Sequence, residues 1–227
     1  MKKITYAIAA ITVFATTLSN AQVNIGVKGG LNFSDAKTDV FIDAVNNAPS
    51  TYTSFVVGGV AEIPLHENFS FQPELLYTKK GFTIDEGTSF DVLGINIPLG
   101  AKATTSISYI ETPLLAKVKL VQGKAKIYGI AGPSIGYATS AKIQPKVTLL
   151  IDFNLPEINL DLSNSIYNRT DISGILGGGA EYNLGSGRIF TDIRYQHSLS
   201  NIINSPIADL TVKNSGFQWT VGYSYTL

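Results

Sequence analysis

A strict two-residue alternation near the end of the chain constrains the fold more than any other feature. Alternate side chains of a β-strand point to opposite faces, so residues 216–227 predict a strand between two different environments. A soluble sheet that packs one face on a core gives the same alternation. One face is entirely apolar or aromatic and the other small or polar: Phe217, Trp219, Val221, Tyr223, Tyr225 and Leu227 against Gly216, Gln218, Thr220, Gly222, Ser224 and Thr226.

The same alternation recurs along the chain, without a convincing helical period of 3.6 residues. Twenty-one glycines, eleven tyrosines and eleven phenylalanines with 15% charged residues also favour β-structure over helix. The sequence predicts eight strands, at residues 23–33, 54–65, 68–80, 106–120, 124–138, 170–184, 188–197 and 213–227.

The polar faces of these strands carry charges of both signs in equal number. Buried charges are tolerated when they are paired and hydrogen-bonded, and an eight-stranded barrel is just wide enough for side chains to fill it. A water-facing soluble sheet can carry the same mixture, but we expect a luminal charge network. Its members are Lys28, Lys117, Lys119, Lys126, Arg194, Glu62, Glu74, Glu111, Glu181 and Asp192.

The connections between the predicted strands alternate between short and long. Short turns fall at residues 66–68, 121–123 and 185–187, and longer stretches at about 34–53, 81–105, 139–169 and 198–212. This pattern is typical of outer-membrane barrels, with short periplasmic turns and long external loops. We therefore predict an all-β fold: an eight-stranded, antiparallel, up-and-down transmembrane β-barrel with both termini on the periplasmic side.

The first residues have the layout of a signal peptide. Lys2 and Lys3 precede a mostly apolar run from residue 4 to 18, and Ser19-Asn20-Ala21 places small residues before Gln22. The run is shorter than the roughly 20 residues of a membrane-spanning helix. We expect cleavage between Ala21 and Gln22, residues 22–227 as one barrel domain, and a location in the bacterial outer membrane.

Composition excludes several classes of function. The chain has no cysteine and two histidines, so a disulfide framework and thiolate metal sites are excluded and we expect no metal or other cofactor. Without residues 1–21, acidic residues exceed basic ones by two. Nucleic-acid binding would need a basic excess, and we expect outer-membrane lipid around a monomeric barrel instead.

Two long connections have an unusual apolar alternation. Residues 90–99 and 147–162 both predict hairpins that continue the barrel wall above the membrane, the second turning at Pro156-Glu157. Their apolar residues either pack on each other or form a surface for a partner, such as another envelope or secretion protein, because exposed apolar patches mark such sites. The candidates are Val92, Ile95, Ile97, Leu149, Ile151, Phe153, Leu155, Ile158 and Leu160.

Prolines and glycines interrupt several predicted strands. Pro73, Pro113 and Pro133 each remove a donor from the strand ladder, so we expect bulges or local interruptions there. Glycines at 29–30, 58–59 and 177–179 predict bends, bulges or close backbone approach.

Four segments resemble the PorT-like family of outer-membrane barrels from Bacteroidota. They are Gly26-Val-Lys-Gly-Gly-Leu-Asn-Phe-Ser34, Glu111-Thr-Pro-Leu-Leu-Ala-Lys117, Gly177-Gly-Gly-Ala-Glu-Tyr182 and Asp192-Ile-Arg-Tyr195, and Gly222-Tyr-Ser-Tyr fits the same pattern. The resemblance implies a filled eight-stranded barrel without an agreed catalytic set. Namesake members of the family assist a secretion system for surface proteins.

Four functions remain open at this stage. The first is a non-enzymatic anchor whose external loops bind a partner or ligand, and the second is a narrow pore for small solutes. The third is a hydrolase built on Asp192, His197 and Ser198, although Asp192 and His197 have opposite parity on one strand. The fourth is a soluble, lipocalin-like barrel.

Overall fold

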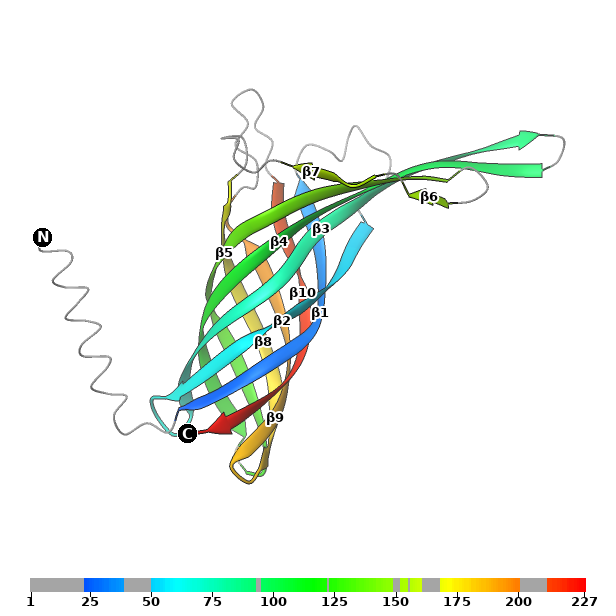
Figure 1. Ribbon diagram of the computed structural model, residues 1–227. Helices are drawn as coiled ribbons and strands as arrows, with labels where there is room; N and C mark the ends of the chain where they lie inside the picture. Colours follow the sequence, from blue (N-terminus) through cyan, green and yellow to red (C-terminus); the bar gives the residue numbers. More distant parts are fainter. Residues whose placement is uncertain are drawn as a thin grey trace, which may run out of the picture.

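The protein forms a barrel of long strands, seen in a computed structural model that describes residues 23–38, 50–92, 95–121, 123–148, 152–154, 156–160, 168–200 and 212–227. Eight strands make the wall (Figure 1): β1 (Asn24–Thr38), β2 (Ser50–Pro64), β3 (Phe69–Val92), β4 (Ile95–Val121), β5 (Ala125–Thr148), β8 (Thr170–Leu184), β9 (Gly187–Ser198) and β10 (Val212–Thr226). The two others, β6 (Asp152–Asn154) and β7 (Ile158–Leu160), are short.

The wall closes on itself. Hydrogen-bonded neighbours follow the order β4-β3-β2-β1-β10-β9-β8-β5, and β4 also pairs with β5. Every one of these pairings is antiparallel. Closure leaves no open edge in the wall, as a barrel in lipid requires. The prediction of an eight-stranded antiparallel barrel is confirmed.

Both ends of the described chain lie at one end of the barrel. The backbone N–H of Leu227 donates to the carbonyl of Val23 at 3.0 Å. The short connections β2–β3, β4–β5 and β8–β9 lie at this same end, and the longer connections lie at the other (Figure 1). The barrel therefore has a turn end and a loop end, which we equate with the periplasmic and external sides.

At the loop end, β3 and β4 are much longer than the sequence predicts. Their register continues to Val92 opposite Ile95. The pairing of β2 with β3 ends at Thr83, and that of β4 with β5 ends at Gly100. Residues 84–92 and 95–99 thus extend beyond the closed wall and are here named the arm, which projects past the barrel mouth in Figure 1. Residues 88–92 and 95–99 form a two-stranded ribbon, whereas residues 84–87 pair with residues 100–103, which still pair with β5. The predicted hairpin at residues 90–99 is the tip of this arm.

The second predicted hairpin is wrong. Segments β6 and β7 do not pair with each other across Pro156-Glu157; each pairs antiparallel with β5, at residues 146–148 and 141–143. The reason is the length of β5. It pairs with β8 only as far as Tyr137 opposite Thr170, so its upper part has a free edge, along which residues 152–160 return.

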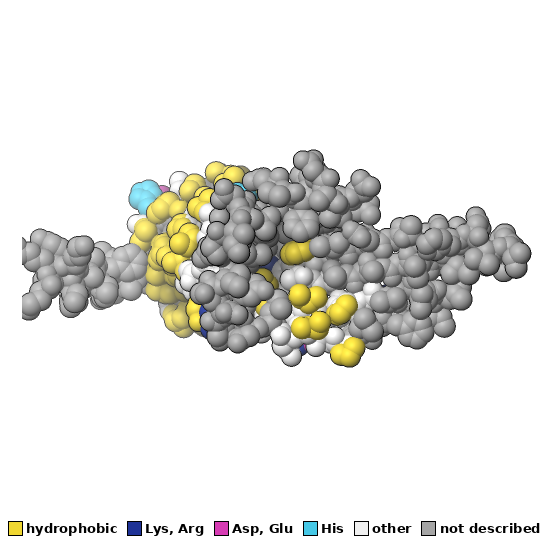
Figure 2. All heavy atoms as spheres, turned by 90° about the horizontal axis from the view of Figure 1, so that it is seen from above, with side chains coloured by type: hydrophobic (Ala, Val, Ile, Leu, Met, Phe, Trp, Pro, Cys, Tyr) yellow, Lys and Arg dark blue, Asp and Glu magenta, His cyan; other side chains and the backbone are white. Residues whose placement is uncertain are grey.

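The alternating faces separate lipid from lumen. Outward apolar side chains are widely exposed, among them Val27 at 66% and Leu176 at 68%. Seen from above, hydrophobic side chains cover part of the outer wall (Figure 2). The inward positions are mostly buried and carry both polar or charged side chains and apolar ones, such as the cluster of Leu115, Tyr128, Ile130 and Ile175. Ile63 is an exception among the outward residues, since it is only 8% exposed beside its cross-strand partner Phe71.

Prolines interrupt pairing without shifting it. Pro73 pairs with Leu114 and Pro113 with Ser134, and the register is the same on either side of each interruption. The described register shifts lie elsewhere, between Thr51 and Val56 of β2, Ser108 and Tyr109 of β4, and Lys119 and Val121 of β4. The expected interruptions are present, but the expected bulges do not fall at the prolines.

One strand glycine shows why a side chain is absent. A Cβ atom added to Gly30 would meet the carbonyl oxygen of Trp219 and would lie 2.7 Å from the Cα of Thr220. Gly30 therefore permits the close approach of β1 and β10, in agreement with the expected role of such glycines.

Candidate functional site

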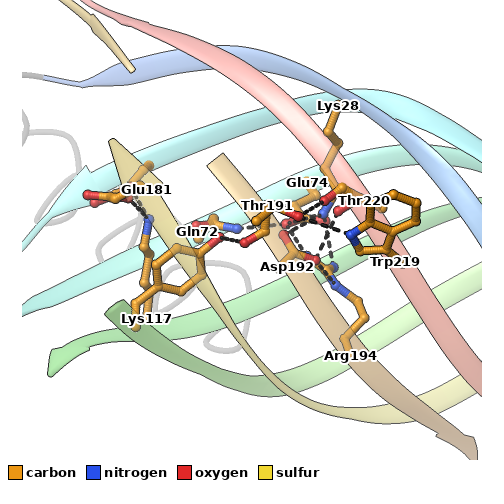
Figure 3. Close-up of polar contacts among 12 residues, drawn as sticks. Lys28, Gln72, Glu74, Lys117, Glu181, Thr191, Asp192, Arg194, Trp219 and Thr220 are labelled. Carbon is orange, nitrogen blue, oxygen red and sulfur yellow. Dashed lines mark hydrogen bonds and ion pairs between the residues drawn. The ribbon is translucent and has the colours of Figure 1, made fainter. Parts of the chain in front are cut away.

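The middle of the lumen is held by a group of four charged side chains, here named the middle tier (Figure 3). Arg194 Nη1 and Nη2 bind the two carboxylate oxygens of Glu74 at 2.9 and 3.1 Å, and Arg194 Nε binds Asp192 Oδ1 at 2.9 Å. Lys28 Nζ lies 3.3 Å from both Glu74 and Asp192. All four side chains are 0% exposed. Two cations and two carboxylates thus neutralise each other across strands β1, β3 and β9.

The turn end of the lumen is more positive. Lys117 Nζ contacts Glu62 at 2.9 Å and Glu181 at 2.5 Å, and Arg188 contacts the same carboxylates at 2.8 and 3.2 Å. Arg188 Nε also donates to Ser224 Oγ at 2.9 Å. This lower tier links β2, β4, β8, β9 and β10.

The loop end of the lumen is more negative. Lys80 Nζ bridges Glu111 Oε1 at 2.5 Å and Asp171 Oδ2 at 3.0 Å. Ser198 Oγ donates to Asp171 Oδ1 at 2.5 Å, and Gln196 Nε2 reaches Glu111 Oε1 at 3.4 Å. This upper tier sets one lysine against two carboxylates, with β3, β4, β8 and β9 as its supports.

The structure places all ten predicted network residues on the inner face. Lys28, Glu62, Glu74, Glu111, Lys117, Glu181, Asp192 and Arg194 are buried. The other two, Lys119 and Lys126, are 11% and 20% exposed at the turn end and approach Glu62 at 3.3 Å and Glu181 at 3.6 Å.

Sequence reasoning missed three charged members: Lys80, Asp171 and Arg188. Each lies an even number of residues from a predicted inward residue on its own strand and therefore points to the same face. Lys80, for example, has this relation to Glu74. The signal was therefore present in the alternation. Lys80, Asp171 and Arg188 lie at or near the ends of predicted strands, and charged residues at those ends were not included in the predicted luminal network.

Side chains leave little open space in the lower half of the lumen. A cavity of about 10 Å³ lies between Glu62, Lys117, Arg188 and Ser224. Its volume is about that of one enclosed water molecule. A cavity of this size cannot pass a hydrated solute.

A model of the family described as "Outer membrane protein beta-barrel domain" matches residues 15–204. The chain belongs to this family. It is thus an outer-membrane β-barrel protein. Comparison with curated protein sequences finds no match. No helix among the described residues has the length and apolar character to cross a membrane.

Solved barrels of other bacteria are distant from this one. Ail, the attachment invasion locus protein of Yersinia pestis, solved with the heparin analogue sucrose octasulfate, is 14% identical with a TM-score of 0.41, over 91% of this chain and 99% of that one. Neisserial surface protein A is 12% identical with a TM-score of 0.40, over 89% and 97%. OprG of Pseudomonas aeruginosa is 13% identical with a TM-score of 0.38, over 91% and 97%.

The three residues considered for a hydrolase do not come together. Asp192 is engaged in the middle tier, where it also accepts a hydrogen bond from Thr220 at 3.0 Å. His197 lies on the outer face, stacked on Tyr195 with ring centroids 6.4 Å apart. Ser198 points inward and donates to Asp171 instead. A triad needs the base beside the nucleophile, so this hypothesis is wrong for these residues.

No metal-binding group of three His, Asp or Glu side chains occurs in the part of the chain that the structure describes.

On the outer wall, Trp219 Nε1 donates to Thr191 Oγ1 at 3.1 Å (Figure 3). This bond satisfies the indole donor on a face that meets lipid, where no water is available to do so.

The predicted partner-binding residues fall at the loop end. Val92, Ile95 and Ile97 are in the arm, Phe153 is in β6 and Leu160 in β7, and Ile158 is 53% exposed. Residues Leu149, Ile151 and Leu155 lie outside the described residues, as do Ala21 and Gln22. Nearby, Lys142 Nζ donates to Glu157 Oε2 at 2.7 Å, and this hydrogen bond lowers the pKa of Glu157.

Proposed function

We propose that this outer-membrane barrel is a non-enzymatic anchor that presents the arm to a partner protein outside the membrane. The arm is the observation that carries the proposal. Within the described ranges, residues 88–92 and 95–99 of the arm pair only with each other, because β2 stops pairing with β3 at Thr83 and β5 stops pairing with β4 at Gly100. A lumen filled by ion pairs supports the role of an anchor.

The arm has the physical properties of a surface that another chain covers. A two-stranded ribbon alone is marginally stable in water. The register sets Phe90 opposite Ile97 and Val92 opposite Ile95, so apolar residues occupy paired positions along its tip. In residues 84–92, the edge of β3 away from β4 has no strand beside it among the described residues. Such an edge accepts an added strand from a partner.

The resemblance to the PorT-like family indicates the class of partner. Its namesake members assist the secretion of surface proteins, so we infer that the partner is another envelope protein engaged in secretion or surface assembly. The barrel itself meets outer-membrane lipid as a monomer, after removal of residues 1–21.

The test compares two deletions in the full-length protein expressed in the outer membrane. One replaces residues 86–99 of the arm with Asn-Gly, and the control removes residues 41–48 from a different external connection. Both variants should keep the heat-modifiable gel migration of a folded barrel, because residues 86–99 lie beyond the closed wall and residues 41–48 lie between β1 and β2 in the sequence.

The readout is capture of a specific protein from detergent-solubilised membranes, followed by rebinding of that purified protein. The wild type and the control deletion should bind it, and the arm deletion should reduce binding at least tenfold. Equal binding by the arm deletion would contradict the proposal. So would the absence of any partner that rebinds the purified wild type.

A further inference from the structure

Buried polar atoms without partners are concentrated in the half of the lumen nearer the loop end. Thr78 Oγ1, Glu111 Oε2, Ser134 Oγ and Gln218 Oε1 have no hydrogen-bond partner among the described residues. The four residues are 0–1% exposed. Leaving a polar atom buried and unpaired costs about 1–3 kcal/mol. Four such atoms in one region therefore point to a bound species that satisfies them.

Gln196 links two of these four residues, Glu111 and Gln218, and also contacts the cross-strand partner of Ser134. Its Nε2 donates to Glu111 Oε1 at 3.4 Å and to Ser173 Oγ at 2.7 Å, and its Oε1 accepts from Gln218 at 3.4 Å. Ser134 is the direct cross-strand partner of Ser173, and such partners have Cβ atoms about 5 Å apart. Glu111 and Gln218 thus meet the same amide, and Ser134 is a diagonal neighbour of Glu111, which pairs with Gly136.

Thr78 reaches the same region from strand β3. Glu111 pairs with Leu76, two residues before Thr78, and Thr78 itself pairs with Tyr109. Its inward hydroxyl is therefore a diagonal neighbour of the Glu111 carboxylate. The four oxygen-bearing side chains come from β3, β4, β5 and β10 and are related through Glu111, by register or by hydrogen bonds of Gln196.

The charge in this region has the sign that a cation requires. Lys80 is shared between Glu111 and Asp171. Asp171 Oδ1 accepts from Ser198 and Ser200, whereas Glu111 Oε2 has no described partner. One lysine therefore faces two carboxylates, and a buried charge without a counter-charge is unfavourable.

We propose that Thr78, Glu111, Ser134 and Gln218 form a binding site for one monovalent cation of the sodium or potassium class. Carboxylate, hydroxyl and amide oxygens replace the hydration shell of such ions. The single excess negative charge matches a monovalent ion, whereas calcium takes six to eight oxygens, commonly from several carboxylates. The site is independent of the proposed partner, since it lies in the lumen and uses no arm residue.

The direct test is crystallographic. Crystals of the wild-type barrel in detergent are soaked in thallium(I), a heavy stand-in for potassium. An anomalous peak beside Glu111 Oε2 is expected. Ordered water there without an anomalous peak would overturn the proposal, because water also satisfies orphaned oxygens.

A second test measures urea unfolding of the micelle-bound barrel in potassium chloride, sodium chloride and choline chloride at equal concentration. A ligand that binds the folded state raises its stability. The urea midpoint should be higher in potassium or sodium than in choline. The increase should disappear in Glu111→Gln and shrink in Thr78→Val, which keeps its shape and the charge of the site.

Glu157→Gln is the matched control, because it removes an exposed carboxylate outside the lumen and should keep the full increase. An equal midpoint in all three salts for the wild type would overturn the proposal. If Glu111→Gln does not fold, Thr78→Val decides, and an undiminished increase in that variant would count against the site.

Discussion

Arg194 is the residue on which the middle of the lumen depends most. It is 0% exposed and binds both Glu74 and Asp192, which leaves Lys28 as their other charged partner. Removing one member of a buried ion pair costs about 3–5 kcal/mol, because the remaining charge stays buried. We expect Arg194→Met to lower the free energy of unfolding by that amount, measured by urea titration in micelles.

Lys142→Met supplies the comparison for Arg194→Met. Lys142 also pairs with a carboxylate, that of Glu157, but both side chains are nearly half exposed. Exposed ion pairs contribute little to stability, so this variant should unfold at nearly the wild-type urea midpoint. Equal destabilisation by the two variants would mean that burial is not what makes the luminal pairs important.

Which residues face the lumen could be predicted, but not which of them meet. Parity on a strand assigns Lys28 and Asp192 to the inside from sequence alone. Their contact joins residues 164 positions apart, and it depends on how the tilted strands are staggered on closure. Local alternation carries no information on that stagger. The unpartnered oxygens around Gln196 were not predictable for the same reason.

At the scale of strands, the membrane-spanning parts were predictable, whereas of the external parts only the hairpin at residues 90–99 was. Within lipid, one face must be apolar, so alternation is strict. Above the membrane that demand ends, and residues 84–92 read Ile-Asp-Glu-Gly-Thr-Ser-Phe-Asp-Val, with acidic and small residues on both parities. The full length of β3 therefore left no clear periodic signal. Residues 147–162 do alternate, but alternation does not say that β6 and β7 pair with β5 rather than with each other.

The outer face of β10 gives a test of depth in the membrane. Val221 lies midway along the lipid-facing part of the strand, and Tyr225 lies at its turn end; their exposures are 46% and 51%. An arginine on the lipid face costs about 2–4 kcal/mol at the membrane midplane and about 0–1 kcal/mol near the interface.

We expect Val221→Arg to lower the free energy of unfolding from vesicles by about 2–4 kcal/mol and Tyr225→Arg to lower it by about 1 kcal/mol or less. The measurement is reversible urea unfolding from lipid vesicles. A cost at Tyr225 as large as that at Val221 would show that the apolar band extends further toward the turns than the strand pattern indicates.

Over the whole molecule, the three tiers form a charge gradient along the barrel axis. The lower tier with Lys119 and Lys126 has more cations than carboxylates, the middle tier is balanced, and the upper tier has an excess carboxylate. Each tier joins strands that are distant in sequence. Ion pairs therefore join distant strands across the lumen at three levels of the barrel.

The occupied lumen predicts different reactivity at its centre and its mouth. The chain has no native cysteine, so single cysteines can be labelled without background. Thr220 is 0% exposed at the middle tier, whereas the Lys126 side chain is 20% exposed at the turn end. In the folded barrel, Lys126→Cys should react with a small charged thiol reagent, and Thr220→Cys should react at least a hundredfold more slowly until urea unfolds it.

Planar-bilayer recordings of the wild type should show no discrete conductance steps. Comparable labelling at the two positions, together with such steps, would show that water crosses the lumen and would replace the anchor with a narrow pore.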